Sequence, residues 1–277
     1  MLTAPHAAAP IGVFDSGVGG LSVLRALRAQ LPQEDFVYLS DAAHAPYGER
    51  TDDYVNARAA GVANYLVAQH GVKALVVACN TATAAAIQLL RARWPTLPIV
   101  GIEPALKPAA TASQTKRVGV MATRSTLQSA KFKTLLESLQ GQAHFVVQAC
   151  DGLAAAIEND DAQMTQALCE TYVRGLGDFG RQPGAIDQLV LGCTHYPLVS
   201  GLLQSLVGPT VDLVEAGAPV SLQTQRVLAQ AELLFCERAA GTTQLLSTGA
   251  VDALGGNARR WLGLEMLVEG VQTDGMS

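Results

Sequence analysis

Short apolar runs alternate with longer segments of helical periodicity, and this alternation constrains the fold more than any other feature of the chain. Four runs in the first part of the sequence are nearly continuous in apolar residues: 11–14, 36–39, 74–78 and 98–101. Such runs are typical of strands that are buried on both faces of a parallel sheet. The segments between them carry helical patterns: 21–30, 52–70 and 83–93. Together they predict an α/β, doubly wound fold.

The same alternation starts again further along the chain. IGVFDSGVGGLSVL at 11–24 and VGVMATRSTLQSAKF at 118–132 share one layout, a strand with Gly second, then small polar residues, then a helix. Their offset of 107 (118 − 11) is close to the 114 (193 − 79) that separates Cys79 from Cys193, each of which ends an apolar run. Two copies of one α/β unit are one interpretation, and a chance likeness between α/β segments is the other.

The part of the chain after Val214 offers two more helices and one more strand. We expect helices at 221–231 and near 252–262, and a strand at 244–247. These elements need a sheet on which to pack. We expect them to complete the first unit rather than to form a third.

Composition excludes several classes of protein. Hydrophobic residues make up 49% of the 277 residues and charged residues 16%, which is typical of a packed core and not of a disordered chain. The net charge of −5 and the absence of a basic stripe argue against nucleic acid as a partner. Because no apolar stretch reaches about 18 residues, we expect no membrane span.

Cysteine usage and the N-terminus point to a reducing compartment. The five cysteines are odd in number and lack the close pairwise spacing of disulfide frameworks and structural zinc sites. MLTAPHAAAP has neither the basic region nor the apolar segment of a signal peptide. We therefore expect a cytoplasmic protein with no metal site.

Polar and reactive side chains follow the ends of four predicted strands. In open parallel sheets, ligands bind beyond the carboxyl ends of the strands. The groups placed there are Asp15-Ser16, Cys79-Asn80-Thr81, Thr123 and Cys193-Thr194-His195. If two sheets face each other, the two cysteines approach one ligand from opposite sides.

The glycine-rich loop DSGVGG at 15–20 admits two interpretations. It follows a strand and opens a helix, so its backbone amides are placed to hold an anion. However, its glycine spacing departs from GxGxxG, and Asp15 would repel a pyrophosphate. An Asp-Ser pair is better suited to an ammonium group or to proton transfer.

Cys79 and Cys193 differ from the other cysteines in their sequence context. We expect Cys150, Cys169 and Cys236 to be small buried hydrophobes. Cys79 and Cys193 each end a strand just before predicted helix N-terminal residues, where backbone N–H groups stabilise a thiolate. His195 stands two residues after Cys193 and is placed to assist it.

Two thiols in matching contexts favour one reaction over another. A single Cys-His pair suits acyl transfer, as in an amidase, but leaves the second cysteine unexplained. Two equivalent bases suit racemisation, in which a proton leaves one face of a carbon and another arrives on the opposite face. The carbanion then needs oriented hydrogen-bond donors. Four nearby residues have side chains of that kind: Ser16, Asn80, Thr81 and Thr194. No motif calls for pyridoxal phosphate.

The loop DAAHAPYGER at 41–50 adds a candidate for binding a carboxylate. Its Pro46-Tyr47-Gly48 sequence predicts a turn with an exposed aromatic ring and with backbone amides within reach of a ligand. An ordinary surface turn is the alternative.

Four motifs, in their order along the chain, resemble those of the glutamate racemase family. They are FDSGVGGLSV, DAAHAPYGER, VVACNTATA and LGCTHYPL, and the resemblance runs from Ile11 to about Val220. ACNTA alone also fits the aspartate racemase relatives. The resemblance implies a cofactor-independent enzyme with Cys79 and Cys193 as its two bases, assisted by Asp15 and His195.

The resemblance also assigns residues to the glutamate site. They are Asp15, Ser16, Pro46, Tyr47, Gly48, Asn80, Thr81, Thr123, Thr194 and His195. Glu158 and Thr126 match family positions in segments that depart from the family pattern: ACDGLAAAIE lacks the usual proline, and Arg124-Ser125 stand where glycine is common. A helix-surface Glu is the alternative reading of Glu158.

The fold implied by the resemblance has two flavodoxin-like, doubly wound domains with a pseudo-twofold relation and the active site in the crevice between them. We expect residues 1–101 and 216–277 to form the first domain and 102–215 the second. The implied activity interconverts L- and D-glutamate and supplies D-glutamate for peptidoglycan synthesis, and hence for cell wall biogenesis and cell shape.

Several alternatives stay open at this point. An aspartate or hydantoin racemase, a degenerate ligand-binding module and a thiol amidase are the other functions. The sequence leaves the oligomeric state open, with a homodimer as one outcome. It also leaves open whether a cell-wall precursor acts as an activator.

Overall fold

The computed structural model describes residues 6–273, and the chain in it divides into two compact units. The first unit runs as far as Ile102 and resumes at Gly217, and the second unit is Glu103–Ala216. Each unit holds one parallel sheet with helices on both faces, so the α/β prediction is confirmed. Among residues 6–273, no helix is both long enough and apolar enough to cross a membrane.

The first unit is built on a six-stranded sheet with the order β10-β9-β2-β1-β3-β4, in which every strand pair is parallel. Its strands are β1 (Ile11–Asp15), β2 (Phe36–Ser40), β3 (Ala74–Val77), β4 (Ile99–Gly101), β9 (Thr243–Ser247) and β10 (Val268–Gly270). The last two come from the C-terminal segment. That segment therefore completes the first unit, as the sequence predicts.

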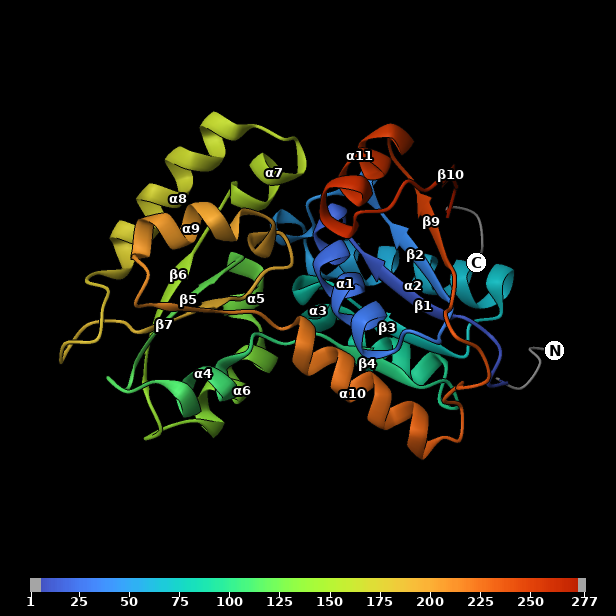
Figure 1. Cartoon of the computed structure of the whole chain (residues 1–277), viewed down its shortest axis with the longest axis horizontal. Helices are drawn as coiled ribbons and strands as arrows, with labels where there is room; N and C mark the ends of the chain where they lie inside the picture. Colours follow the sequence, from blue (N-terminus) through green and yellow to red (C-terminus); the bar gives the residue numbers. More distant parts are fainter. Residues whose placement is uncertain (1–5, 274–277) are drawn as a thin grey trace. The chain divides into compact units, whose positions relative to one another are not determined.

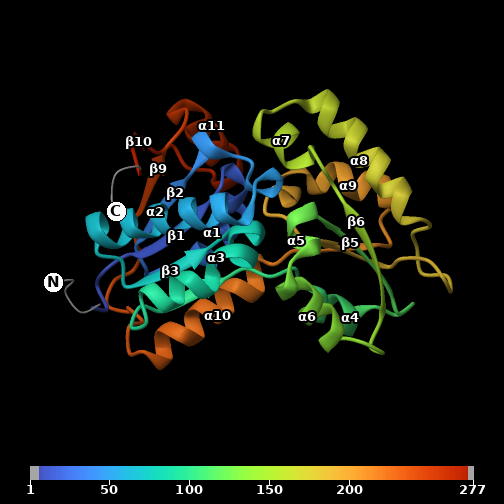
Figure 2. The same ribbon diagram turned by 180° about the vertical axis from the view of Figure 1, so that it is seen from behind.

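Helices cover both faces of this sheet (Figures 1 and 2). They are α1 (Leu21–Gln30), α2 (Asp52–His70), α3 (Asn80–Arg93), α10 (Gly217–Gln230) and α11 (Val251–Leu262). Helix α10 packs against α1 on one face, and α2 packs against α3 on the other. Short 3-10 turns, η1 (Val18–Gly20), η2 (Ala42–His44) and η3 (Tyr47–Glu49), follow β1 and β2.

The long helix α2 shows how local sequence sets the ends of an element. Thr51 caps its N-terminus by accepting a hydrogen bond from the backbone N–H of Tyr54, and Asp52 and Asp53 in the first turn favour the positive end of the helix dipole. Gly71 ends the helix in the left-handed conformation, with φ of 55°. The observed helix therefore matches the predicted bounds, 52–70.

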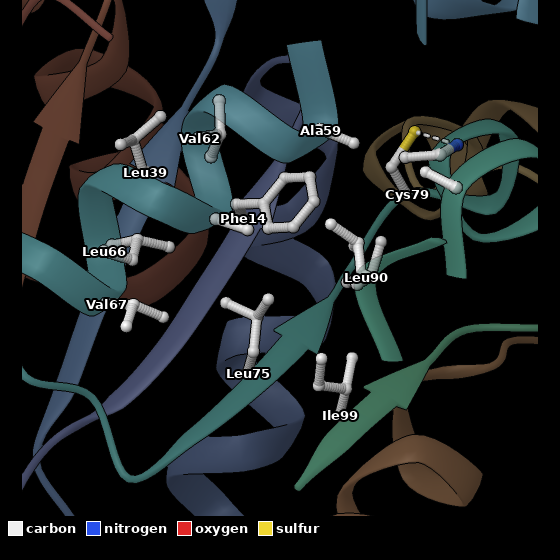
Figure 3. Close-up of a cluster of buried hydrophobic side chains, with 14 of the residues drawn as sticks. Phe14, Leu39, Ala59, Val62, Leu66, Val67, Leu75, Cys79, Leu90 and Ile99 are labelled. Atoms are coloured by element: carbon white, nitrogen blue, oxygen red, sulfur yellow. Dashed lines mark hydrogen bonds between the residues drawn. The ribbon is translucent and has the colours of Figure 1, made fainter. Parts of the chain in front are cut away.

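A buried apolar cluster of the first unit lies between the sheet and the pair α2 and α3 (Figure 3). Phe14 of β1 lies near the middle of this cluster in Figure 3, and Leu66 of α2 and Leu75 of β3 pack in the same cluster. Cys79 closes the cluster at the carboxyl end of β3, where a dashed line in Figure 3 joins its sulfur to a nitrogen. Packing against this apolar core thus fixes the position of the Cys79 thiol.

The second unit has a four-stranded parallel sheet with the order β6-β5-β7-β8. Its strands are β5 (Arg117–Ala122), β6 (His144–Ala149), β7 (Gln188–Leu191) and β8 (Asp212–Val214). Its helices are α4 (Leu106–Ala112), α5 (Arg124–Gln128), α6 (Ala130–Ser138), α7 (Leu153–Glu158), α8 (Ala162–Leu176) and α9 (Ser200–Val207), with a 3-10 turn η4 (Tyr196–Val199). Residues of α7, α8 and α9 form one apolar cluster, and residues of α4 and α6 form another.

The two units share one topology. The order β2-β1-β3-β4 in the first unit recurs as β6-β5-β7-β8 in the second, and it is the order of flavodoxin-like folds. A Cβ at Gly12 of β1 would lie 3.1 Å from Val72 and 3.3 Å from Leu75. A Cβ at Gly119 of β5 would lie 3.1 Å from Leu189 and 3.3 Å from Ile186, the equivalent neighbours. The repeated layout of the sequence is thus matched by repeated packing.

Candidate active site

Apart from Pro46, Tyr47, Gly48 and Glu158, the predicted site residues of each unit lie at the carboxyl ends of two adjacent strands. In the first unit these are β1 and β3, and in the second they are β5 and β7. In both sheets this pair is the topological switch point, where open α/β sheets bind ligands. The predicted site residues therefore form two groups, one in each unit, which are described in turn.

Cys79 is the N-cap residue of α3. Its sulfur accepts a hydrogen bond from the backbone N–H of Ala82 at 3.4 Å, and its side chain is buried with 5% exposure. Backbone N–H groups at a helix N-terminus favour a negative charge on the sulfur. The prediction that Cys79 ends a strand and begins a helix is confirmed.

Asp15 and Ser16 form a short polar chain next to this thiol. The buried carboxylate of Asp15 accepts hydrogen bonds from the backbone N–H of Ser16 at 2.7 Å and from its hydroxyl at 3.4 Å. The Cys79 thiol donates to the Ser16 hydroxyl over 3.8 Å. Ser16 thus connects the thiol to the carboxylate, an arrangement that suits proton transfer.

Asn80 carries an amide oxygen that is buried and has no hydrogen-bond partner among the described residues. The residue is only 5% exposed, and Thr81 beside it is 3% exposed. An unpaired buried oxygen costs about 1–3 kcal/mol. A ligand that brings an N–H donor, such as an ammonium group, would offset that cost.

Tyr47 is buried, with 1% exposure, so the prediction of an exposed aromatic is wrong. Its hydroxyl donates to Oδ2 of Asp41 at 2.5 Å, and its ring packs in the core cluster of the first unit. Burial and the neighbouring Asp41 raise the pKa of Tyr47 well above its usual value, so the hydroxyl stays protonated. Pro46 and Gly48, on either side of it, are partly exposed.

Gly192 brings Cys193 to the edge of the second sheet. Its backbone N–H donates to the carbonyl of Met121 at 2.7 Å, and a Cβ there would come within 2.9 Å of that oxygen. The first unit has the equivalent hydrogen bond, from Ala78 to Phe14 at 2.8 Å. Both cysteines therefore follow a residue that is tied to the neighbouring central strand.

His195 lies between a thiol and a carboxylate. Its Nδ1 is 3.8 Å from the sulfur of Cys193, and its Nε2 is 2.6 Å from Oε2 of Glu158, the last residue of α7. Burial lowers the pKa of His195, but the hydrogen bonds and charges of Cys193 and Glu158 outweigh burial and raise it well above the usual value. This shift favours the charged form of the imidazole beside the sulfur.

The surroundings of Cys193 differ from the predicted helix N-terminus. The residues after it form the 3-10 turn η4, whose N-cap is His195. The imidazole, rather than a helix N–H, is its partner. Glu158 contacts His195, so it is not the isolated helix-surface residue that was the alternative to the family match.

Thr123 and Thr126 belong to one capping arrangement at the end of β5. Thr123 caps α5 by accepting from the backbone N–H of Thr126 at 3.3 Å, and its hydroxyl donates to that of Thr126 at 2.9 Å. Thr194 is buried beside Cys193. The group in the second unit thus combines a thiol, an imidazole and buried hydroxyl groups.

Three residues near these two groups were not identified by the sequence analysis. Tyr196 is fully buried, and burial together with Cys193 and Cys150 raises its pKa well above its usual value. Asp41 and Arg58 lie under the Tyr47 loop. Asp41 was detectable, because it follows the end of β2 just as Ser16 follows that of β1.

The remaining cysteines are of two kinds. Cys150 and Cys169 are buried, as predicted, and burial raises the pKa of Cys169 to about 11. Cys236 is exposed, so its predicted burial is wrong: it lies in a segment without helix or strand after α10. Within residues 6–273, no group of three or more His, Cys, Asp or Glu side chains is arranged to hold a metal ion.

Comparison with known proteins identifies relatives along most of the chain. The Asp/Glu/Hydantoin racemase family profile matches residues 11–220. Glutamate racemase of Ectopseudomonas mendocina is 50% identical over 236 residues, which cover 84% of this chain and 88% of the relative. That of Pseudomonas aeruginosa PAO1 is 47% identical over 234 residues, covering 84% and 86%.

Solved structures give the same result. Glutamate racemase of Bacillus anthracis superposes with a TM-score of 0.85 at 31% identity, covering 96% of this chain and 98% of that one. The Escherichia coli enzyme, in complex with L-glutamate and the activator UDP-MurNAc-Ala, has a TM-score of 0.81 at 26% identity, covering 95% and 98%. The Francisella tularensis enzyme in complex with D-glutamate has the same score and identity, covering 96% and 98%. The chain therefore belongs to the glutamate racemases of the Asp/Glu/Hydantoin racemase family and is an isomerase.

Proposed function

We propose that this chain interconverts L- and D-glutamate with Cys79 and Cys193 as two acid–base groups and without a cofactor. The observation that carries the proposal is the equivalent position of the two thiols. Cys79 lies two residues after β3, and Cys193 lies two residues after β7, the strand at the matching place in the shared order. Relatives bind L-glutamate in one solved complex and D-glutamate in another, which supports glutamate as the substrate.

A duplicated thiol suits the symmetry of racemisation. The two enantiomers have equal free energies, so the enzyme must remove and deliver a proton equally well in both directions. A base is then needed on each face of the α-carbon, and the thiols supply both. An amidase uses one nucleophile and would leave one of these cysteines without a role.

In the direction from L- to D-glutamate, the family resemblance makes Cys193 the base and Cys79 the acid. The Cys193 thiolate takes the α-proton, so the C–H bond breaks and an S–H bond forms, and the electron pair stays on carbon as a carbanion. The Cys79 thiol then delivers its proton to the opposite face. Solvent exchange restores the two sulfurs to their starting protonation states.

The surroundings of each sulfur support these roles. The charged imidazole of His195, held by Glu158, favours a thiolate at Cys193. At Cys79 the N–H of Ala82 favours the thiolate, and Ser16 connects the sulfur to the Asp15 carboxylate. Asp15 and His195 therefore assist the two thiols.

The remaining candidate residues of the two groups are assigned to substrate binding. The unpaired oxygen of Asn80 and the carboxylate of Asp15 suit the ammonium group. The donors proposed for the carboxylates and for the developing carbanion are the Ser16 hydroxyl, the backbone N–H groups of Tyr47 and Gly48, and the hydroxyl groups of Thr81, Thr123 and Thr194. Pro46, which has no N–H, is proposed to line the site beside them. Oriented donors of this kind stabilise charge that develops in the transition state. Thr126 supports Thr123 through their hydrogen bond.

The family resemblance extends the proposal to the cell. D-glutamate made in the cytoplasm would enter peptidoglycan synthesis and thereby serve cell wall biogenesis and cell shape.

Racemisation in deuterium oxide tests the two-base reaction. With L-glutamate as substrate, the early D-product is expected to carry solvent deuterium, while recovered L-glutamate stays unlabelled, because each thiol serves one face. Extensive carry-over of the original proton into the product indicates a single base and contradicts the proposal. Parallel incubation with L-aspartate and other single amino acids, followed by circular dichroism, separates glutamate racemisation from its alternatives.

Cysteine variants complete the test. Cys79→Ser and Cys193→Ser are each expected to lose nearly all racemisation, because each loss removes a base in one direction and an acid in the other. They should differ in the enantiomer whose α-proton still exchanges slowly: L-glutamate in Cys79→Ser and D-glutamate in Cys193→Ser. Cys150→Ser, a buried thiol without an assigned role, is the control and should keep its activity.

A further inference from the structure

A buried carboxylate, Asp41, lies beneath the loop that carries Pro46, Tyr47 and Gly48. Asp41 is fully buried and follows the last residue of β2. Its two oxygens accept hydrogen bonds from side chains far apart in the chain. The donors are the Tyr47 hydroxyl at 2.5 Å, Arg58 Nε at 3.0 Å, Arg58 Nη2 at 2.8 Å and the Thr248 hydroxyl at 2.9 Å, with Nδ1 of His44 at 3.1 Å.

Arg58 connects this carboxylate to the C-terminal segment. It extends from α2, is 9% exposed, and bridges both oxygens of Asp41 with its planar guanidinium group. Its Nη2 also donates to the hydroxyl of Thr273 at 2.5 Å, and Thr273 is 3% exposed. The C-terminal segment thus touches the same ion pair that holds Tyr47.

The loop is held at further points by the same set of residues. The backbone N–H of Ala43 donates to the Thr248 hydroxyl at 3.2 Å, and the backbone N–H of Thr248 donates to the carbonyl of Ser40 at 3.0 Å. The Tyr47 hydroxyl is committed to Asp41. What the loop offers a ligand is therefore its backbone, at positions fixed by these contacts.

We propose that the Asp41–Arg58 pair, braced by Thr273, is a positioning device that holds the loop 42–50 in its substrate-binding conformation before glutamate arrives. The proposal rests on the proposed function insofar as this loop binds a glutamate carboxylate. A loop that is already ordered spares the substrate the entropic cost of ordering it, which raises affinity. The ionic pair fixes one geometry, since its hydrogen bonds form only when the guanidinium, hydroxyl and carboxylate groups are aligned.

A second buried ion pair in the same unit provides a matched control. Lys73, directly before β3, is fully buried and pairs with Glu34, which also accepts a hydrogen bond from the backbone N–H of Phe235 at 2.9 Å. This pair lies at the amino ends of the strands, whereas Asp41 lies at a carboxyl end. Loss of this pair should lower the stability of the protein without changing the conformation of the loop 42–50.

The experiment compares Arg58→Lys, Thr273→Val, Thr273→Ser and Glu34→Gln in the full chain. Arg58→Lys keeps the charge but cannot bridge both oxygens. We expect it to raise KM for both L- and D-glutamate by about 10- to 100-fold, with a smaller change in kcat. Thr273→Val should raise KM less than Arg58→Lys does. Thr273→Ser, which keeps the hydroxyl, should have the KM of the starting protein. Glu34→Gln should lower the melting temperature and leave KM within about twofold of the starting protein.

Amide hydrogen exchange of the unliganded protein gives a readout that needs no activity. Peptides covering 41–50 should exchange faster in Arg58→Lys and Thr273→Val, and unchanged in Glu34→Gln. If Arg58→Lys leaves both KM and the exchange of this loop unchanged, or if Glu34→Gln at an equal loss of melting temperature raises KM as much, the positioning role is overturned. Absence of glutamate racemisation in the starting protein would count against the proposed function alone, because the exchange data would still test the bracing.

Discussion

The Nε2 atom of His195 lies 2.6 Å from Oε2 of Glu158, while Nδ1 of the same ring lies 3.8 Å from the sulfur of Cys193. The imidazole therefore has an acceptor at one end and the reactive thiol at the other. This geometry favours a positive charge beside Cys193, since the two partners together raise the pKa of His195 in spite of its burial.

Replacing Glu158 by Gln is expected to lower the pKa of His195, because the negative charge that stabilises the imidazolium is lost. The limb of the pH profile of kcat/KM on which His195 loses its proton should then move to lower pH, and activity at neutral pH should fall. Glu170→Gln removes a charge from α8 in the same unit and serves as the control. Identical pH profiles for the starting protein and Glu158→Gln would show that Glu158 does not support the charge of His195.

Asp15→Asn and His195→Asn are expected to lower kcat by about 10²–10⁴-fold and to change KM much less. Each residue is proposed to tune a neighbouring thiol rather than to hold the substrate. Steady-state kinetics in both directions measures the two parameters separately. A variant in which only KM rises would assign that residue to binding instead.

Gly192→Ala is expected to lower activity by displacing Cys193. The added Cβ would meet the Met121 carbonyl oxygen at 2.9 Å and the Ala122 side chain at 3.0 Å, so the backbone before the thiol must shift. Gly201→Ala in α9 is the matched control, since a Cβ there has nothing within 4 Å. That control should keep its activity and gain about 0.5–1 kcal/mol of stability. Equal activity in both variants would show that the close approach at Gly192 is not needed.

Asp187→Asn should reduce stability at neutral pH by about 1–3 kcal/mol and reduce it less in acid. Burial raises the pKa of Asp187, but hydrogen bonds from Ser113, Gln114 and Thr115 outweigh burial and lower it. The carboxylate thus contributes stability that is present above its unfolded pKa of about 3.9 and is lost as pH falls through the lower folded value.

Chemical denaturation across this acid range measures the effect. The difference in free energy of unfolding between the starting protein and Asp187→Asn should shrink towards low pH. Asp178→Asn, the same change at an exposed position, should show little difference at any pH. A difference for Asp187→Asn that is independent of pH would contradict the role assigned to its charge.

Exhaustive dialysis with a chelator and hydroxylamine is expected to leave racemisation intact, because the proposed reaction uses side chains alone. Activity is measured before and after dialysis on the same sample. Loss of activity that pyridoxal phosphate or a divalent metal restores would overturn the two-thiol reaction.

Much of the fold was predictable because it depends on local patterns. The continuous apolar runs identified the central strands, and the helix at 52–70 has local start and stop signals in Thr51 and Gly71. The positions of the candidate site residues were predictable for a related reason. They follow apolar runs directly, so a sequence that reveals the end of a strand also reveals what stands there.

The network under Tyr47 was not predictable, since its members are distant in sequence. Arg58 lies 17 residues after Asp41, and Thr273 lies 215 residues after Arg58. Periodicity within a window carries no information about such pairs. The burial of Tyr47 follows from the same contacts, which explains why the turn residues around it suggested an exposed ring.

The order of the strands along the chain has a consequence for biosynthesis. The second unit is contiguous, so all four of its strands have left the ribosome once Val214 has emerged. The first unit begins earlier but still lacks β9, β10 and the helix α10 that packs against α1. A nascent chain halted at Ala216 therefore presents one finished sheet and one with an open edge at β2. Synthesis of β9 covers that edge, and the sheet whose strands are made first is completed after the other.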